Sequence, residues 1–477
     1  MSVGEISLFA NSRKSLPYVS VVSLSRRIPP WPTPARNSTI SVSRMNRCKL
    51  MNPIGKASIR SHIAILMLGA GTLLVSQSGC RDQTPVASHY EPNYLFAKAT
   101  EIGLSKEEGE LEPTIQDSQN LLVEWFGTME DPKLPSLLKE DDYSDLISEA
   151  NLKIAVGTPK EPGIYIQQCV SCHGSSGQGR GTNAASQDPY PRDFRMGIFK
   201  FKSSPRTARP VKEDIEKVLR NGLSGSQMPL FNKLSDQEIQ ALVDYVVFLS
   251  LRGEFERRLI QLSATEWEGE RLYDPSAEKS VLEGQLSNAS DALTEIADRW
   301  VRSADAVEDF PRPSFPLVGT ETDENKEELI SSIEKGKVLF VSEIASCSKC
   351  HGVNADGKGN QLPDYDDWTK DWTSKIGIQP TDSQSLLPLM ARGGMKPLPL
   401  KPRSIIEGHF RGGRTPEDLY RRIRYGIAGS PMPAAAVVES RDEPGLIDED
   451  LWHLVNYVLS IANVPPPPME TKVVSTQ

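Results

Sequence analysis

Two short stretches of the sequence carry the same combination of cysteine and histidine. The segment CVSCHGSSGQGRG begins at Cys169, and CSKCHGVNADGKG begins at Cys347. Together they use four of the six cysteines and two of the six histidines in the chain. In each segment two thiols three positions apart fall on nearly one face of a helical turn, with an imidazole directly behind them. Both sulfur atoms can then bond to one edge of a flat ring system while the imidazole binds a metal at its centre.

The pattern C-x-x-C-H is the attachment signature of c-type haem, with the histidine as the proximal iron ligand. Other uses of the pair are less consistent with this chain. A redox pair would stand without the adjacent histidine, a zinc site would need its two knuckles closer than 178 residues, and a disulfide across so short a loop would be strained. We therefore predict two covalently bound haem c groups, attached and ligated by Cys169, Cys172, His173, Cys347, Cys350 and His351.

A sixth iron ligand is predicted for each haem from a pair of matching methionines. Met228 lies in GSQMP and Met432 in GSPMP, both on Gly-rich loops that follow a helix. A thioether is a soft donor suited to iron in an apolar crevice, and methionine opposite histidine raises the reduction potential. Met196, Met390 and Met395 have no such register and are assigned to packing or loops.

These motifs belong to an internal repeat, whose helices must position them. The two cysteine motifs lie 178 residues apart, and the two methionine loops match at a constant offset of 204. PRDFRMGIFKF aligns with PRSIIEGHFRG, and LSDQEIQALVDYV aligns with LIDEDLWHLVNYV, with Tyr245 over Tyr457. Each copy reads helix, cysteine motif, Gly-rich loop, helix, Gly-Met-Pro loop, final helix. The gaps differ, and the second copy holds the largest insertion, between its cysteine motif and Pro402.

Each copy resembles a class I c-type cytochrome domain, the first over residues 156–252 and the second over 328–463. Besides the haem motif and the Met-Pro loop, such domains carry a Gly-x-Gly loop and a glycine with an aromatic residue on the preceding helix. The matching residues here are Gly177 and Gly179, Gly357 and Gly359, Gly163 with Tyr165, and Gly336 with Phe340. The second copy departs by about three extra residues before Cys347, which leaves the register of its first helix open.

The resemblance also implies roles for residues around the iron. A proline carbonyl accepts the Nδ1 proton of the proximal histidine in this family. The alignment suggests Pro191 and Pro402 for this role, with Pro189 as a competitor. Tyr245 and Tyr457 are expected to pack between terminal helices. His409 and His453 are expected at the surface or in the core rather than on iron.

The predicted fold is all-α, with two cytochrome c-type helical domains joined by a helical linker and preceded by a helical module. The predicted order is an extension ahead of the true start (1–50), a signal segment (51–80), an N-terminal helical module (81–155), domain 1 (156–252), the linker (253–327), domain 2 (328–463) and a Pro-rich tail (464–477).

Charge separates the N-terminal segment from the rest of the chain. Residues 1–60 contribute +9 to a total of −9, so the chain from Cys80 onward carries −18, since 61–79 are uncharged. Such acidity argues against nucleic acid and favours protein partners. A basic start, an apolar run and small residues before Cys80 form an export signal, for which Met45 or Met51 is the expected start. Cys80 stands in a lipoprotein-like box, with ordinary cleavage or an uncleaved anchor as alternatives.

These features predict a periplasmic, membrane-anchored di-haem cytochrome that carries single electrons in a respiratory chain and is not an enzyme. Its partners would be a redox donor and a redox acceptor. One alternative is an electron-transfer subunit docked to a membrane oxidase or quinol-oxidising complex. A di-haem cytochrome c peroxidase is disfavoured, because it needs one iron that can open, and both copies carry a Met-Pro loop.

Overall fold

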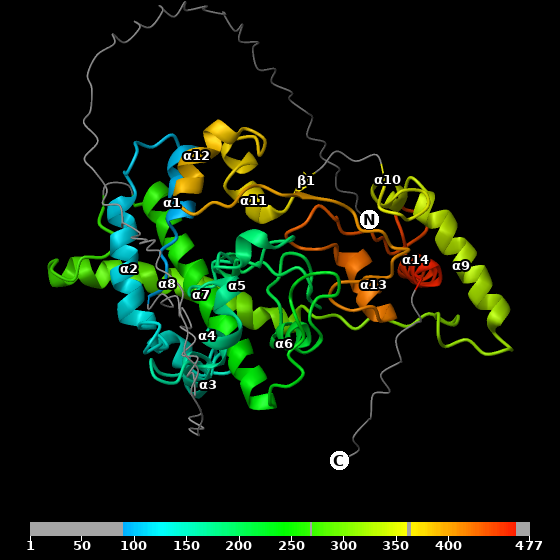
Figure 1. Cartoon of the computed structure of the whole chain (residues 1–477), viewed down its shortest axis with the longest axis horizontal. Coiled ribbons are helices and arrows are strands. Elements are labelled where there is room, and N and C mark those ends of the chain that lie inside the picture. Colours follow the sequence, from blue (N-terminus) through cyan, green and yellow to red (C-terminus); the bar gives the residue numbers. More distant parts are fainter. Residues whose placement is uncertain (1–88, 268–269, 360–363, 464–477) are drawn as a thin grey trace, which may run out of the picture. The chain divides into compact units, whose positions relative to one another are not determined.

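The computed structural model describes residues 89–267, 270–359 and 364–463, and these residues are mostly helical (Figure 1). The all-α prediction is therefore confirmed. The described residues all belong to one compact unit. The predicted extension, signal segment, Cys80 and Pro-rich tail lie outside the described residues. Within the described ranges no helix combines the length and apolar character needed to cross a bilayer.

The helices and strands have the following bounds. Up to the first methionine loop they are α1 Tyr94–Gly103, α2 Glu112–Phe126, η1 Ser136–Lys139, α3 Glu149–Val156, α4 Ile164–Gln168, α5 Val170–His173, η2 Ala184–Ser186, η3 Phe194–Met196 and α6 Lys212–Asn221. The next are α7 Asp236–Thr265, α8 Lys279–Asp305, α9 Lys326–Val341 and α10 Cys347–His351. The last are β1 Asp364–Tyr365, α11 Asp367–Asp371, η4 Ser374–Ile376, α12 Ser383–Ala391, β2 Pro399–Leu400, α13 Pro416–Tyr425 and α14 Asp448–Ile461.

The helix α7 is the centre of the first half of the structure. It begins with a capping box, in which Ser235 accepts from the backbone of Glu238 and the Glu238 carboxylate accepts from Ser235. Its apolar residues are buried along most of its length, and α1, α2, α3, α4, α6, α8 and η3 all pack against it. α7 therefore carries the end of the first copy, the N-terminal module and the linker on one core.

In the second copy α9 packs along α14, and α13 packs against α14 from another side (Figure 1). α13 begins with Thr415 as the N-cap and Pro416 in its first turn, and Asp418 completes a capping box. A hydrophobic core of buried side chains joins these helices, centred on Phe340, Tyr420, Leu451 and Trp452.

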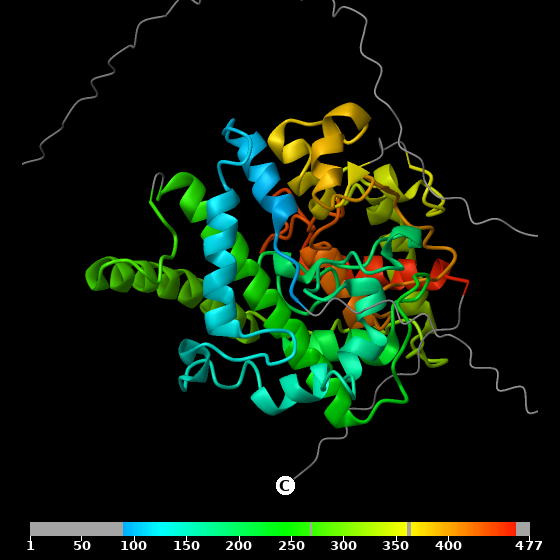
Figure 2. The same ribbon diagram turned by 60° about the vertical axis from the view of Figure 1, so that its left-hand side comes forward.

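The insertion in the second copy forms short helices rather than a loose loop. β1 and β2 pair in antiparallel fashion, Asp364 with Leu400 and Tyr365 with Pro399, at the two ends of the inserted segment. Between them α12 and η4 pack against α1 of the N-terminal module. Both views place α12 beside α1 (Figure 2). Leu95, Trp372 and Leu389 belong to the small core of this contact.

One large core crosses the predicted boundaries at 156 and 253. It contains Phe126 and Leu152 of the N-terminal module, Tyr245 of the first copy and Trp300 of the linker. The predicted division into a module, two domains and a linker remains a prediction.

Candidate functional site

The first cysteine motif forms a single helical turn. Cys169 accepts hydrogen bonds at its carbonyl from the backbone N–H of Cys172 (3.1 Å) and of His173 (2.8 Å). The thiols of Cys169 and Cys172 are free. Burial, followed by the nearby Cys172, raises the pKa of the Cys169 thiol to about 12. Both sulfur atoms and the imidazole thus project from one turn, as attachment to a porphyrin edge requires.

The second motif repeats this backbone closely. Gly174 N–H donates to Val170 (2.8 Å), and Gly352 N–H donates to Ser348 (2.9 Å). The carbonyls of the two motif histidines accept from Gly179 and Gly357, each at 2.8 Å. Neither Cys347 nor Cys350 forms a disulfide within the described part of the chain. The repeat seen in the sequence is therefore a repeat of local structure.

The glycine pairing predicted for these loops was shifted. At the constant offset of 178, Gly179 matches Gly357 through their bonds to the histidine carbonyls, and Gly181 matches Gly359 through theirs to Cys172 and Cys350. Gly177 therefore corresponds to Ala355, which holds the same left-handed conformation with φ of 58°. A glycine is not required at that position in the second copy.

Each motif histidine donates its Nδ1 proton to a backbone carbonyl. His173 Nδ1 lies 3.2 Å from the carbonyl oxygen of Arg192, and His351 Nδ1 lies 3.0 Å from that of Arg403. The prediction of Pro191 and Pro402 was wrong by one residue in both copies, and Pro189 is not the acceptor. Since a carbonyl can only accept, Nδ1 carries the proton and Nε2 keeps its lone pair.

Burial keeps both rings neutral. It lowers the pKa of His173 to about 4, against a smaller opposing effect of the bond to Arg192. Burial lowers the pKa of His351 as well. A neutral imidazole with a free Nε2 is the form that binds a metal, so the donor set of both copies fits a haem iron.

The methionine loops also match bond for bond. Leu223 N–H donates to the Met228 carbonyl (3.2 Å), and Ile427 N–H donates to the Met432 carbonyl (3.1 Å). Each methionine N–H in turn lies near a serine hydroxyl, that of Ser226 (3.2 Å) or Ser430 (3.3 Å). Both methionines are half-buried. Met228 packs against the core that contains Cys169. The ligand role of both methionines remains a prediction.

The aromatic residues of the terminal helices pack as predicted. Tyr165 and Tyr245 have ring centroids 4.7 Å apart, and Phe340 and Tyr457 have theirs 5.3 Å apart. The Tyr165 hydroxyl donates to the carbonyl of Gly174, directly behind the first motif. The first pair therefore connects the first cysteine motif to α7, and the second pair joins α9 to α14.

The helix before the first motif differs from the expectation. In the second copy Gly336 packs on α14, where a Cβ would overlap the carbonyl oxygen of His453. In the first copy Gly163 lies instead against Ala155 and Gly157, because the chain leaves α3 at Gly157 and turns before the short α4. The helix that packs broadly against α7 is α3.

The other two histidines considered in the sequence lie in the core (His453) and at the surface (His409), the two kinds of position expected for them. His453 is 2% exposed, its Nδ1 lies 2.7 Å from the Ser332 hydroxyl, and its ring stacks on Phe315. His409 is exposed. In the part of the chain that the structure describes, no group of three or more His, Cys, Asp or Glu is placed to hold a metal ion.

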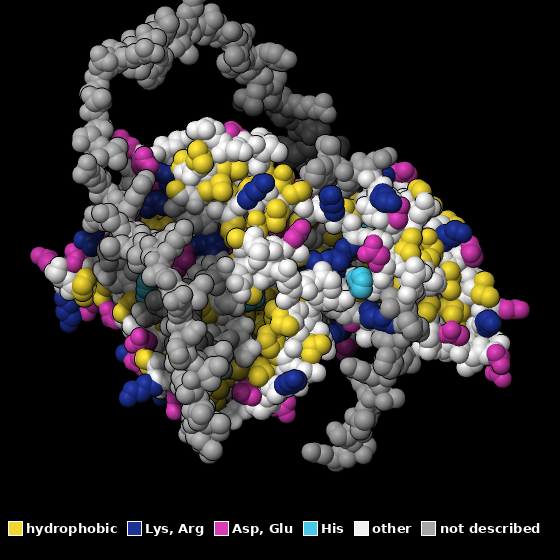
Figure 3. Space-filling model, viewed as in Figure 1, with side chains coloured by type: hydrophobic (Ala, Val, Ile, Leu, Met, Phe, Trp, Pro, Cys, Tyr) yellow, Lys and Arg dark blue, Asp and Glu magenta, His cyan; other side chains and the backbone are white. Residues whose placement is uncertain are grey.

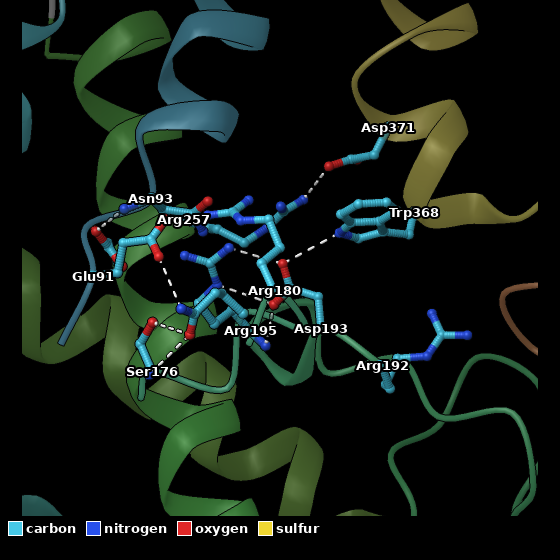
Figure 4. A network of polar contacts seen from close by, with 12 residues as sticks. Glu91, Asn93, Ser176, Arg180, Arg192, Asp193, Arg195, Arg257, Trp368 and Asp371 are labelled. Atoms are coloured by element: carbon cyan, nitrogen blue, oxygen red, sulfur yellow. Dashed lines mark hydrogen bonds and ion pairs between the residues drawn. The ribbon is translucent and has the colours of Figure 1, made fainter. Parts of the chain in front are cut away.

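The loop that contains Arg192, whose carbonyl accepts from His173, is called the first histidine loop. A buried charge network lies directly behind it, and the sequence analysis missed this network (Figure 4). Asp193 accepts from Nε (3.0 Å) and Nη2 (2.9 Å) of Arg195 and from Nε1 of Trp368 (3.3 Å). Arg195 is 1% exposed. Arg180 pairs with Glu91 beside them. The signal was present, because DFR in the first copy stands where the second copy has SII.

One comparison with known proteins agrees with this geometry for the first copy. A family model described as cytochrome C oxidase, cbb3-type, subunit III matches residues 161–246. This match supports a c-type cytochrome domain over these residues, a class of domain that binds haem c covalently and transfers electrons. Among solved structures, the chain is similar to one from the Kuenenia stuttgartiensis reducing HAO-like protein complex Kustc0457/Kustc0458, at 23% identity, covering 62% of this chain and 93% of that chain, with a TM-score of 0.36. No curated protein matches the chain.

Proposed function

We propose that the chain is an exported c-type cytochrome with two haems that carries single electrons by outer-sphere transfer. The main support for a second haem is the pattern of hydrogen bonds that is shared between the two cysteine motifs and between the two methionine loops. Because Cys347, Cys350, His351 and Met432 repeat the surroundings of Cys169, Cys172, His173 and Met228, both copies have the same donor set.

The residues of the chain would hold each cofactor and tune it. The haem supplies the one-electron chemistry, and the protein supplies attachment, axial ligands and burial. The carbonyls of Arg192 and Arg403 fix the histidine tautomer and make each imidazole a stronger donor. If each iron were bound by one of these histidines and one of these methionines, neither iron would have a free position for a substrate.

Electron transfer to a protein partner needs an encounter surface, and one is exposed beside the second motif. Val338, Val341, Ile344 and Val353 are between 48% and 69% exposed. Figure 3 shows hydrophobic side chains gathered over α9 on this face. Exposed apolar groups next to an electron-transfer centre favour brief contact with a redox partner.

A subunit role in a membrane complex is the second candidate. The match of residues 161–246 to a family described as an oxidase subunit favours it. The N-terminal module and the linker helix α8, which share a core with the first copy, would add docking surface. The export signal and the lipoprotein-like box at Cys80 would keep the protein at the membrane. Co-purification from membranes in mild detergent tests this candidate.

A redox titration followed by visible spectroscopy tests the main proposal. We expect two haem c groups that remain with the polypeptide after acid-acetone extraction and that titrate with separate midpoint potentials. Loss of all colour to the solvent would overturn covalent attachment. Rapid CO binding by the reduced protein at neutral pH would indicate an open iron and favour a peroxidase instead.

A further inference from the structure

The two copies contact each other twice through the same pair of loops, with each copy supplying the other loop of the pair in the second contact. Arg192 and Arg403, whose carbonyls accept from the two histidines, occupy matching positions, as do Gly225 and Gly429 in the methionine loops. A Cβ on Gly225 would lie 3.0 Å from Nη1 of Arg403, and a Cβ on Gly429 would lie 3.4 Å from Nη1 of Arg192. The loop behind each histidine therefore lies against the methionine loop of the other copy.

One arginine of the first copy makes this contact much more extensive on one side. Nη1 of Arg206 donates to the carbonyls of Ile427 (2.9 Å) and Met432 (2.8 Å). Its Nη2 donates to the carbonyl of Ser430 (2.9 Å). Asp367 lies 3.9 Å from the same guanidinium. Arg206 thus binds three carbonyls of the second methionine loop and joins its two ends.

In the described structure, the hydrogen bonds from the second copy to the first methionine loop lie near the tip of this loop. The Gly225 carbonyl accepts from Nη2 of Arg411 (2.7 Å) and of Arg403 (3.2 Å), and the Ser224 hydroxyl lies 3.3 Å from Nδ1 of His409. Among the hydrogen bonds of the described residues, no side chain of the second copy reaches the carbonyl of Met228. The two loops share their internal bonds but differ in how the opposite copy holds them.

We propose that Arg206 of the first copy positions Met432 as an axial ligand, so that the first copy controls how firmly the second iron keeps its methionine. This inference rests on the proposed function, in which Met432 is that ligand. A neutral thioether is a weak donor, and its bond to iron persists only while the backbone holds the sulfur in place. Hydrogen bonds from a charged donor are stronger than neutral ones, and a fork of them fixes the loop in one geometry.

The test is Arg206→Gln in the full chain with both haems. We expect the weak far-red absorption band of a sulfur–iron(III) bond to lose intensity and one of the two midpoint potentials to fall. Added imidazole, used as a probe for an open iron, should bind one ferric haem about tenfold more tightly, the effect of losing about one charge-assisted hydrogen bond. Both haems should stay attached, because the change touches no cysteine.

Two variants separate positioning from general loss of structure. Arg206→Lys keeps the charge but cannot bind three carbonyls at once, so it should give an intermediate effect on imidazole affinity. Arg220→Gln is the matched control, because Arg220 pairs with Glu216 and Asp236 inside the first copy. It should leave the far-red band and both potentials unchanged. Equal effects of Arg206→Gln and Arg220→Gln would overturn the proposal.

Met432→Ala distinguishes failure of this inference from failure of the proposed function. If Met432→Ala leaves the band and both potentials unchanged, Met432 is not a ligand and the proposed function is wrong for the second haem. If Met432→Ala changes them but Arg206→Gln does not, the positioning role is overturned and the proposed function stands. In the double variant, Arg206→Gln should add nothing to Met432→Ala.

Discussion

At the scale of single residues, burial decides the chemistry of both motif histidines. The low pKa of His173, about 4, means that its ring is neutral throughout the physiological range. The carbonyl bonds of His173 and His351 then leave Nε2 as the donor atom in each copy. A doubly protonated ring could not bind a metal. Because burial removes the water that would solvate the imidazolium, it favours the neutral ring, which can bind one.

Replacing a predicted methionine ligand should change one haem only. Met228→Ala should lower one midpoint potential by on the order of 100 mV, a modest part of the roughly 0.8 V that axial ligands span in haem proteins. Covalent haem content should not change, because the cysteines remain. Redox titration with mass spectrometry measures both. Met390→Ala is the control, since Met390 is 40% exposed on α12. Two unchanged potentials in Met228→Ala would remove this methionine from the ligand set.

The buried acid behind the first histidine loop should stabilise the fold in a pH-dependent way. Burial alone would raise the pKa of Asp193, but Arg195, then Arg180 and Arg257, outweigh it and lower the pKa to about 2. Asp193→Asn leaves the Arg195 guanidinium buried without its anion. We therefore expect a loss of about 3–5 kcal/mol in the free energy of unfolding at neutral pH.

The sign of the pH dependence follows from the lowered pKa. The ionised Asp193 contributes its full stabilisation above its ordinary value of 3.8, and the contribution is lost as the pH falls from 3.8 to about 2. Denaturant unfolding of the wild type and of Asp193→Asn should be measured across this range. The difference between their free energies of unfolding should become smaller as the pH falls. For the control Ser404→Ala, at the matching position of the second copy, the difference from the wild type should not change with pH. A pH-independent difference for Asp193→Asn would contradict the stabilising role of the ionised Asp193.

At the scale of helices, close packing of α9 on α14 depends on one missing side chain. A Cβ at Gly336 would overlap the His453 carbonyl oxygen and lie 2.8 Å from Cβ of Tyr457. Gly336→Ala should therefore destabilise the protein by about 1–3 kcal/mol, despite the better helix propensity of alanine. Denaturant unfolding measures this loss.

Gly284 of α8 provides the matched control, because a Cβ there meets nothing within 4 Å. Gly284→Ala should be neutral or stabilise by up to about 1 kcal/mol, which is the propensity difference alone. If both glycine variants behave alike, the contact between α9 and α14 is not as close as the structure gives it.

The elements that sequence reasoning misplaced have identifiable physical reasons. The GTPKEPG segment after α3 holds two prolines, which lack an N–H and disfavour helix, and this signal was available for the break before α4. By contrast, no signal in the sequence indicated that the acceptor of the histidine proton is the carbonyl of Arg192 rather than that of Pro191. A proline marks the turn, but which carbonyl faces the histidine depends on backbone angles that Cys169 to His173 do not encode. The residues of the cysteine motifs and methionine loops are local and repeated, and the two copies share the hydrogen bonds of these segments, while their roles as haem ligands remain predictions.

At the scale of the whole molecule, the two copies share a plan but not their surroundings. α7 continues beyond the position that corresponds to the end of α14, and the start of this continuation carries Arg252, Glu254 and Glu256, all buried. Gly253 gives Arg195 room to lie against this helix. Among the described residues, this buried charge lies behind the histidine of the first copy, and the matching positions of the second copy hold Ser404, Ile405 and Ile406. We therefore expect the two haems to differ in potential, which the alignment of the motifs alone would not suggest.

Contacts between distant segments explain why the sequence could not give the arrangement of the copies. Arg206 and the carbonyls it binds are more than 220 residues apart, and the sequence marks neither side as a partner of the other. Likewise Trp368 of the insertion reaches Asp193 of the first copy (Figure 4). A loop insertion predicted from a gap in the repeat is, in the folded chain, part of the support of the first histidine loop.

The acidic charge of the chain should govern how it meets its redox partner. The chain from Cys80 onward carries −18, so long-range attraction should speed encounter with a basic protein and be screened by salt over a Debye length of about 8–10 Å. Stopped-flow reduction by a small basic cytochrome should slow about tenfold or more between 10 mM and 0.3 M salt. An acidic cytochrome of similar potential should show the opposite trend, because screening then removes repulsion. Equal and salt-independent rates with both would mean that the encounter uses an uncharged surface, such as the exposed side chains of Val338, Val341, Ile344 and Val353, rather than the acidic charge of the chain.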